Sequence, residues 1–175
     1  MTDIEDFMHV AQIRRLDITN GEGIGISLFT SGCPIHCKNC FNSELWDMQS
    51  GSKWTTECED TIINLLKPQY IRRFSILGGE PLIGRNIESL TTLIKHIKSL
   101  YGNSKKIWLW TGNTYENVSL LYPSLIDLLD VIVDGPYVDE LKDSNLDWRG
   151  SSNQRVIDVR KTRESGKITL YESSF

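Results

Sequence analysis

Three of the protein's four cysteines stand close together near the front of the chain, in the stretch SGCPIHCKNCFNSELW. Cys33, Cys37 and Cys40 have the spacing C-x3-C-x2-C, and Cys58 is the fourth cysteine. Thiolates bind zinc and iron–sulfur clusters, so this spacing predicts a metal centre. A structural zinc site needs four ligands and an ordinary electron-transfer cluster needs four cysteines. Three close sulfurs therefore leave one position open.

A zinc site would need His36 or Cys58 as its fourth ligand. His36 directly precedes Cys37, which is an awkward direction for both side chains to face one ion. Cys58 falls in the first turn of a predicted helix, four residues before Ile62, where a buried core thiol is expected. A 4Fe–4S cluster held by three cysteines instead leaves one iron free to bind a small molecule. We favour this cluster and keep a zinc-stabilised binding module as the alternative.

Charge and hydropathy limit the partners of the chain. Its net charge is -4 and its pI is near 5.4, whereas nucleic acids and membrane surfaces favour a basic face. No apolar run approaches the roughly 18 residues of a membrane helix, and the start, MTDIEDFMHV, is acidic where a secretory signal is basic. We expect a cytoplasmic protein with no nucleic-acid or membrane partner. Cysteines stay reduced in that compartment, which disfavours a disulfide framework.

The rest of the chain alternates predicted strands with predicted helices. Short apolar runs predict strands at residues 9–18, 23–32, 74–77, 106–112 and 130–135, and in QRVIDV and KITLY. One helix is predicted to begin with a capping box formed by Thr56 and Glu59 and to stop before Pro68. Helical periodicity predicts a second at residues 86–101, and shorter pieces within TYENVSLLYPSLIDLLD.

This alternation predicts an α/β fold with a mainly parallel sheet, in a single domain covering residues 1–175. A complete β/α barrel takes about 250 residues, so we expect a partial, open barrel. Ligands of such sheets gather at the carboxyl ends of the strands, which here read TSGC, LGGE, WTG and VDG. Glycine at every predicted strand end suits a ligand that comes close to the backbone.

The cysteine spacing resembles the signature of the radical S-adenosylmethionine superfamily, in which the methionyl amino and carboxylate groups chelate the open iron. The segment Gly78-Gly79-Glu80-Pro81 is similar to the GGEP motif of the same superfamily, which holds the methionyl ammonium group. Strand-end carbonyls and a carboxylate suit a cation. The resemblance implies a partial barrel of the radical S-adenosylmethionine type that binds a 4Fe–4S cluster and S-adenosylmethionine.

Further blocks resemble one family in particular. DITNGEG, SLFTSGCPIHCKNCFNSELW, KIWLWTG, DVIVDGPY and LDWRGSSNQRVID are similar to the anaerobic ribonucleoside-triphosphate reductase activating protein family, from about Asp17 to Asp158. The resemblance implies that an electron from a cytoplasmic donor, such as flavodoxin or ferredoxin, cleaves S-adenosylmethionine to methionine and a 5′-deoxyadenosyl radical. That radical would take a hydrogen atom from a glycine of the large reductase chain, forming a glycyl radical.

The nearest alternative is another small radical enzyme of the superfamily, acting on a small molecule or on a different glycyl-radical enzyme. The WRGSSNQR block argues against it, because this block is among the pieces most particular to the activating proteins.

The resemblance also implies roles for particular residues. Cys33, Cys37 and Cys40 are the expected cluster ligands, and the GGEP motif is the expected methionyl site. Besides Cys40, the residues expected at the cofactor are Asn39, Phe41, Gly78, Gly79, Glu80, Thr111, Gly112 and Asp134. For the last three, and for Gly135, the alternative is a strand-end turn that contacts no ligand. Two roles stay open for Ser151, Asn153 and Arg155. They could line the opening to the substrate site, or they could cap the C-terminal strands.

Two positions depart from the resembled pattern. Asn39 stands where most superfamily members carry an aromatic residue that packs on adenine, so the adenine contact is unassigned. Gly25 stands where the family commonly shows arginine.

Ordinary structural roles are expected elsewhere. His96 falls opposite the apolar stripe of its helix and is expected to be solvated, and Trp108 and Trp110 share a strand face and are expected to pack in the core. The charged run DELKDSNLDWR is most simply a solvated loop, and it is also a candidate reductase-binding surface.

Overall fold

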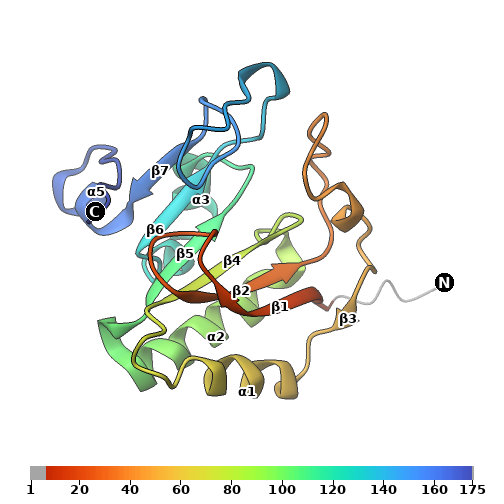
Figure 1. The fold of residues 1–175 in the computed structure, drawn as a ribbon, viewed down its shortest axis with the longest axis vertical. Coiled ribbons are helices and arrows are strands. Elements are labelled where there is room, and N and C mark those ends of the chain that lie inside the picture. Colours follow the sequence, from red (N-terminus) through yellow and green to blue (C-terminus); the bar gives the residue numbers. More distant parts are fainter. Residues whose placement is uncertain (1–6, 175) are drawn as a thin grey trace.

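The structure, a computed structural model, describes residues 7–174 and arranges them around one seven-stranded sheet (Figure 1). The strands are β1 (His9–Asp17), β2 (Gly25–Thr30), β3 (Ser52–Lys53), β4 (Arg73–Gly78), β5 (Lys106–Trp110), β6 (Val131–Asp134) and β7 (Arg155–Asp158). The helices are α1 (Thr56–Leu65), α2 (Gly84–Tyr101), α3 (Tyr115–Leu121), α4 (Pro123–Ile126) and α5 (Val159–Ser165). Single 3-10 turns are η1 (Ser43–Leu45), η2 (Gly102–Ser104) and η3 (Asp139–Leu141).

The sheet is open, with strand order β3-β1-β2-β4-β5-β6-β7. Its central strands β2, β4, β5 and β6 are parallel neighbours, as expected where helices connect them. The outer strands β3, β1 and β7 pair antiparallel. The predicted α/β class is confirmed, and the sheet is mixed, with a parallel centre and antiparallel edges.

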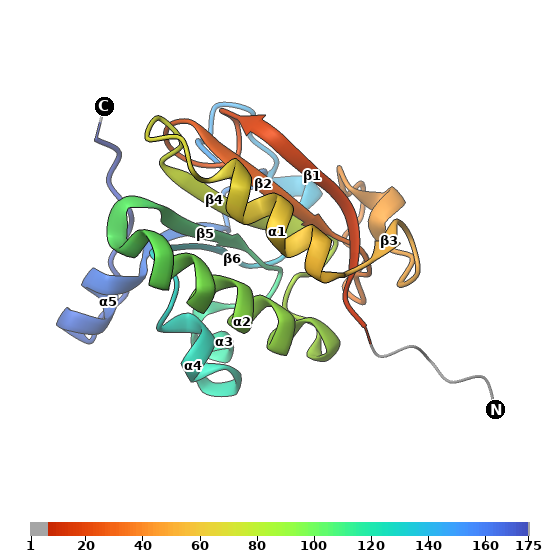
Figure 2. The ribbon, with the colours of Figure 1, turned by 90° about the horizontal axis from the view of Figure 1, so that it is seen from below.

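The two faces of the sheet are covered differently. Helices α1, α2, α3 and α4 lie across one face (Figure 2) and bury an aliphatic core that includes Ile26, Leu28, Phe74, Ile76, Leu109 and Ile132. A smaller hydrophobic cluster lies on the other face of the sheet and is formed by Trp108, Val131, Val133, Val156, Trp110, Trp148 and Tyr171. The rings of Trp108 and Trp110 stack with centroids 5.7 Å apart, so the predicted core packing of these two tryptophans is confirmed.

The start of α1 differs from its prediction in two ways. Thr55 is the N-cap, since its hydroxyl accepts a hydrogen bond of 3.4 Å from the backbone N–H of Cys58. Thr56 is therefore the first helical residue rather than the cap. Cys58 is partly exposed, and the buried residue of the helix is Ile62. The prediction of a buried core thiol at position 58 is wrong, because the first turn of α1 lies at the rim of the core.

The C-terminal segment KITLY also differs from its prediction, since it forms no strand. It meets β7 only through a bridge between Ile157 and Leu170. Tyr171 then turns inward, its ring 5.0 Å from that of Trp108, and its hydroxyl donates a hydrogen bond to Glu22.

The remaining minor predictions have mixed outcomes. His96 is exposed, as predicted, and its Nδ1 lies 2.7 Å from the carboxylate of Glu59 on α1. Within residues 7–174, no helix has both the length and the apolar character needed to cross a membrane. The prediction of a cytoplasmic protein rests partly on the acidic segment 1–6, which lies outside the described residues.

A buried polar network occupies the sheet face opposite the helices, around Asp17 and Arg73. The side chains of both residues are almost fully buried, and Arg73 donates to the Asp17 carboxylate at 3.4 Å. That carboxylate also accepts hydrogen bonds from the backbone N–H groups of Thr19 and Asn20 and from the hydroxyl of Ser27. Burial alone would raise the pKa of Asp17, but these hydrogen bonds outweigh it and hold the pKa well below its ordinary value.

We therefore expect Asp17→Asn to lower the free energy of unfolding at pH 7 by about 3 kcal/mol, because it leaves the Arg73 charge buried without its partner. The ionised carboxylate stabilises the fold above its ordinary pKa of 3.8, and this contribution is lost as the pH falls through the lowered folded-state pKa. The difference between wild type and variant should thus shrink below pH 3.8. Urea unfolding across pH measures it, and a pH-independent difference would contradict this account.

Candidate metal and cofactor site

The three clustered cysteines line one cavity of about 140 Å³ at the carboxyl ends of the parallel strands. The loops that follow β2, β4, β5 and β6 gather at this end of the sheet (Figure 1). The predicted site residues that line the cavity are Cys33, Cys37, Cys40, Gly78, Gly79, Glu80, Thr111 and Gly112. The fold therefore brings the cysteine motif and the GGEP motif into one site.

Two left-handed residues shape the cysteine loop. His36 and Asn39 have φ values of 52° and 55°, a conformation that asparagine tolerates better than most residues. The backbone N–H of Cys40 donates to the carbonyl of Cys37 at 3.1 Å. These turns reverse the chain between the cysteines, so that all three border the same cavity.

Trp46 anchors the loop from outside. Its carbonyl accepts from the N–H of Cys33 at 3.2 Å, and its indole stacks on the ring of His36 at 4.4 Å. His36 is thus engaged by an aromatic partner, and Cys58 does not line the cavity. Within residues 7–174, no three or more His, Cys, Asp or Glu side chains are placed to hold one metal ion. Burial raises the pKa of the Cys33 thiol, although backbone N–H groups nearby oppose the shift.

The glycines of the GGEP motif allow two strand ends to approach each other. Gly78 has φ +124°, and a Cβ placed on it would lie 2.3 Å from the carbonyl oxygen of Thr30. A Cβ on Gly79 would lie 2.3 Å from the carbonyl oxygen of Gly32. The N–H of Gly79 donates to Thr30 O at 2.8 Å. The space that glycine opens at these two positions is thus used by the protein's own backbone.

Glu80 is a buried carboxylate at the edge of the cavity. It is 2% exposed and accepts hydrogen bonds from the Thr111 hydroxyl at 2.8 Å, the Leu82 N–H at 2.9 Å and the Gly112 N–H at 2.8 Å. Burial raises its pKa, in opposition to these hydrogen bonds. No ion pair to Glu80 occurs within the described part of the chain. A cationic group bound in the cavity would stabilise its ionised form.

Asn42 connects the two motifs, a role that the sequence analysis missed. Its backbone N–H points to the Cys40 sulfur at 3.4 Å, and its side-chain amide donates to the carbonyl of Gly78 at 3.1 Å. The sequence signal for it is the triplet CFN at residues 40–42, in which only Cys40 and Phe41 are predicted to contact the cluster or cofactor. The other cavity-lining residues that went unpredicted are Ile35, Leu77, Trp110, Tyr137 and Gln154.

Asp134 lies outside the cavity lining, unlike the other strand-end residues. Its carboxylate accepts from the Tyr115 N–H at 2.7 Å and from Nε of Arg155 at 3.0 Å. Arg155 also donates to Glu116 at 2.8 Å, and hydrogen bonds to these two carboxylates raise the pKa of Arg155. The structure thus uses Asp134 and Arg155 to join the start of α3 to β6 and β7.

The rest of the WRGSSNQR block braces the segment that follows β6. The Ser151 hydroxyl accepts from the Val138 N–H at 3.1 Å, and the Asn153 amide donates to the Pro136 carbonyl at 2.8 Å. Gln154 donates to the Gly135 carbonyl at 3.0 Å and also lines the cavity. Gly135 itself borders the cavity as well.

Asn39 and Phe41 lie on the outer side of the cysteine loop. The amide of Asn39 donates to Asp139 at 2.7 Å, and the neighbouring Lys38 pairs with Glu140 at 2.9 Å. The charged run that begins at Asp139 is therefore not simply solvated, since it contacts the cysteine loop. Phe41 is 69% exposed.

Phe41 borders a second cavity of about 590 Å³. It shares residues with the first cavity, namely Cys40, Asn42, Leu77, Trp110, Tyr137 and Gln154. The other residues that line it are Thr19, Asn20, Phe41, Trp148, Arg149 and Gly150. The buried Nε of Arg149 has no hydrogen-bond partner in the described part of the chain. The two cavities form neighbouring compartments, a small one at the cysteines and a larger one with aromatic and amide walls.

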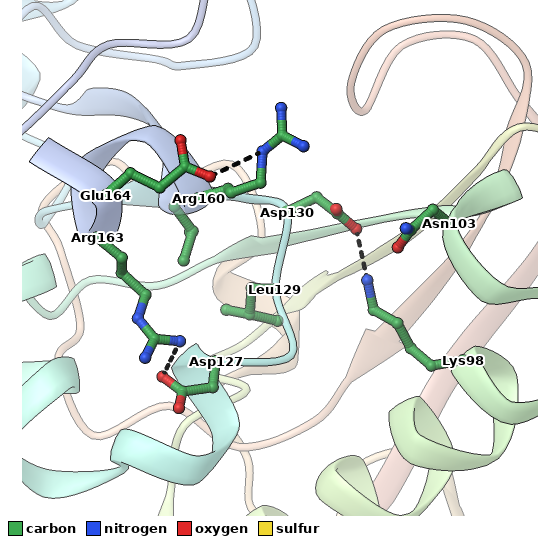
Figure 3. Close-up of a pocket in the computed structure, with 9 residues that line it drawn as sticks. Lys98, Asn103, Asp127, Leu129, Asp130, Arg160, Arg163 and Glu164 are labelled. Atoms are coloured by element: carbon green, nitrogen blue, oxygen red, sulfur yellow. Dashed lines mark hydrogen bonds and ion pairs between the residues drawn. The ribbon is translucent and has the colours of Figure 1, made fainter.

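A third cavity, of about 430 Å³, lies near the amino end of β6, between α2 and α5 (Figure 3). The charged side chains that line it form ion pairs with one another. Lys98 pairs with Asp130 at 3.0 Å, Arg163 pairs with Asp127, and Arg160 pairs with Glu164 (Figure 3). None of the predicted site residues lines it.

Comparison with known proteins places the chain in a class and then in a family. Residues 19–157 match the family described as a 4Fe-4S single cluster domain. The chain is 39% identical over 155 residues to the anaerobic ribonucleoside-triphosphate reductase-activating protein of Escherichia coli (strain K12), covering 87% of this chain and 100% of the relative. It is 39% identical to the protein of that name from Vibrio cholerae (85% and 97% coverage) and 34% identical to that of Enterobacteria phage T4 (85% and 93% coverage).

The chain is thus a 4Fe-4S single cluster domain protein. Within that class, it belongs to the anaerobic ribonucleoside-triphosphate reductase-activating protein family.

We expect Gly78→Ala to destabilise the fold by more than about 3 kcal/mol, because the added Cβ meets backbone atoms and the residue keeps a positive φ. Gly84→Ala is the matched control, since a Cβ there meets nothing within 4 Å. The control should be neutral or stabilise by up to about 1 kcal/mol. Urea unfolding followed by circular dichroism compares the two, and equal midpoints would refute the close approach of β2 and β4.

Proposed function

We propose that the protein is a radical S-adenosylmethionine activase of partial β/α barrel fold, which generates the glycyl radical of anaerobic ribonucleoside-triphosphate reductase. The observation that carries the proposal is that Cys33, Cys37, Cys40 and the buried Glu80 line one cavity. The names of the relatives support the partner, the large chain of the reductase. A one-electron donor such as flavodoxin or ferredoxin completes the system.

The residues at the cavity fit a 4Fe–4S cluster with one open iron. Cys33, Cys37 and Cys40 line the cavity and can supply three thiolates, and Cys58 does not line it. Cys33, Cys37 and Cys40 would hold the cluster, which would supply the electron for reductive cleavage of S-adenosylmethionine and so the radical chemistry needed to take a hydrogen atom from the target glycine.

The chain's own residues bind and orient the reactants. Glu80 would attract the methionyl ammonium group, because its buried carboxylate has no cationic partner among residues 7–174. Thr111 and Gly112 hold the Glu80 carboxylate in place and act through it. Asn42 keeps the cysteine loop in register with Gly78, so the cluster and methionyl sites stay at a fixed separation. Leu77 and Trp110 exclude water from the border of the two cavities.

The cluster assignment predicts that Cys33→Ala, Cys37→Ala and Cys40→Ala each lose the cluster, while Cys58→Ala keeps it. The protein is purified without oxygen, reconstituted with iron and sulfide, reduced, and examined by electron paramagnetic resonance with and without S-adenosylmethionine. A reduced 4Fe–4S spectrum that changes on adding S-adenosylmethionine, followed by a glycyl-radical signal on the reductase chain, is the expected result. A colourless protein with stoichiometric zinc would overturn the proposal.

Glu80→Gln tests the cation site. The amide keeps the size of the side chain but removes its charge, so affinity for S-adenosylmethionine should fall about tenfold or more. In the wild type, affinity should also fall as the pH is lowered through the raised pKa of Glu80, above its ordinary value of 4.5, because protonation removes the attraction. The variant should lack this pH dependence.

Binding isotherms of the anaerobic holoprotein at several pH values supply the measurement. Glu57→Gln, at an exposed position on α1, is the control and should bind as the wild type does. If Glu80→Gln and Glu57→Gln bind equally well at every pH, Glu80 is not the cation site.

A further inference from the structure

Arg73 holds the segment that joins β1 to β2. Its side chain is 1% exposed and donates to the backbone carbonyls of Asp17 at 2.8 Å, Gly23 at 3.3 Å and Glu22 at 3.3 Å. A planar guanidinium can satisfy several carbonyls at once, which an ammonium group cannot do in the same geometry. Arg73 on β4 therefore supplies several of the hydrogen bonds that tie segment 18–24 to the sheet, beside the Arg72 N–H, which donates to the Ile24 carbonyl at 2.8 Å.

Two glycines make room for that side chain. A Cβ on Gly25 would lie 2.6 Å from the carbonyl oxygen of Arg73 and 2.9 Å from both its Cβ and its Cζ. A Cβ on Gly21, which has φ +111°, would lie 2.6 Å from Cδ of Arg73. The aliphatic part and guanidinium of Arg73 thus lie across positions where any larger residue would collide with them.

Gly25 and Arg73 are also partners in the register of the parallel pair β2 and β4. Paired residues of neighbouring strands face the same side of a sheet, and the strands lie about 4.8 Å apart. An arginine side chain is longer than this separation. A guanidinium could therefore reach the same carbonyls from either position, provided that the other position is glycine.

The segment held by Arg73 forms a wall of the second cavity. Thr19 and Asn20 line that cavity together with Cys40. The backbone carbonyl of Asn20 accepts a hydrogen bond from the Ser75 hydroxyl at 2.6 Å. The side-chain amide of Asn20 donates to the Asp17 carboxylate at 2.6 Å. Arg73 in turn contacts both Ser75 and Asp17. The position of this wall thus depends on the Arg73 network.

We propose that positions 25 and 73 form one arginine site shared by two strands, from which Arg73 positions segment 18–24 as a wall of the second cavity. An arginine at position 25 opposite a glycine at position 73 performs the same role. Arg73 is a positioning residue in this account, because it contacts segment 18–24 and does not itself line the second cavity.

The test compares two double variants that carry the same backbone change. Gly25→Arg with Arg73→Gly moves the guanidinium across the strand pair. Gly25→Ala with Arg73→Gly adds the same Cβ at position 25, with the same contact to the carbonyl of residue 73, but no guanidinium. Amide hydrogen exchange of residues 18–24 and urea unfolding are measured on both, beside wild type and Arg73→Gly.

We expect exchange in segment 18–24 to be about tenfold faster than wild type in Arg73→Gly and in the alanine double variant, because the charge-assisted hydrogen bonds to its carbonyls are lost. The arginine double variant should recover most of the protection. Equal exchange and equal unfolding midpoints in the two doubles, including failure of both to fold, would overturn the proposal.

The predicted effect of Arg73 on activation of the reductase rests on the proposed function and is measured in a separate experiment. If the second cavity, which Cys40 also lines, admits the reductase chain, Arg73→Lys should raise KM for that chain while leaving kcat and the cluster spectrum unchanged, because it loosens the wall without changing the cysteine loop. A lowered kcat or an altered cluster spectrum would show that Arg73 acts on more than the wall. If the wild type shows no activation at all, the proposed function fails, whereas the exchange comparison still decides the arginine site.

Discussion

The close approach of the ends of β2 and β4 is the constraint on which the site depends. Gly78 and Gly79 let the β4 backbone lie against Thr30 and Gly32, immediately before the first cysteine. This contact places Glu80 and the cysteine loop around one cavity, and the amide of Asn42 joins them a second time. Side-chain chemistry from two distant parts of the sequence becomes one site because two backbones can touch.

Two buried carboxylates differ in how far the fold compensates their charge. Burial would raise the pKa of Asp17, but hydrogen bonds from Asn20, Ser27 and Thr19 lower it, and the ionised carboxylate pairs with Arg73. Glu80 has fewer donors and no ion pair in the described part of the chain, so burial raises its pKa. A charge that the protein leaves uncompensated is suited to a cationic ligand, and one that it compensates fully is not.

Sequence reasoning succeeded where a local pattern carried the information and failed where a partner came from elsewhere. The apolar runs predicted the central strands, and Trp108 and Trp110 were placed on one core face by their spacing alone. Asp134 ends β6 and Thr111 directly follows β5, yet the Asp134 carboxylate is hydrogen-bonded to Arg155 instead of lining the cavity. The missing arginine at position 25 was visible in the sequence, whereas the presence of Arg73 beside Gly25 is visible only through the register of β2 and β4.

The sequence by itself determined the α/β class, the cysteine and GGEP motifs and the family, because these depend on residue type and on spacing within short segments. Only the tertiary structure decided which strand-end residues share the cavity, that Asn42 links the two motifs, and that KITLY forms no strand. Those outcomes depend on distances between segments far apart in the chain. Such distances follow from strand order, register and packing, which no local pattern encodes.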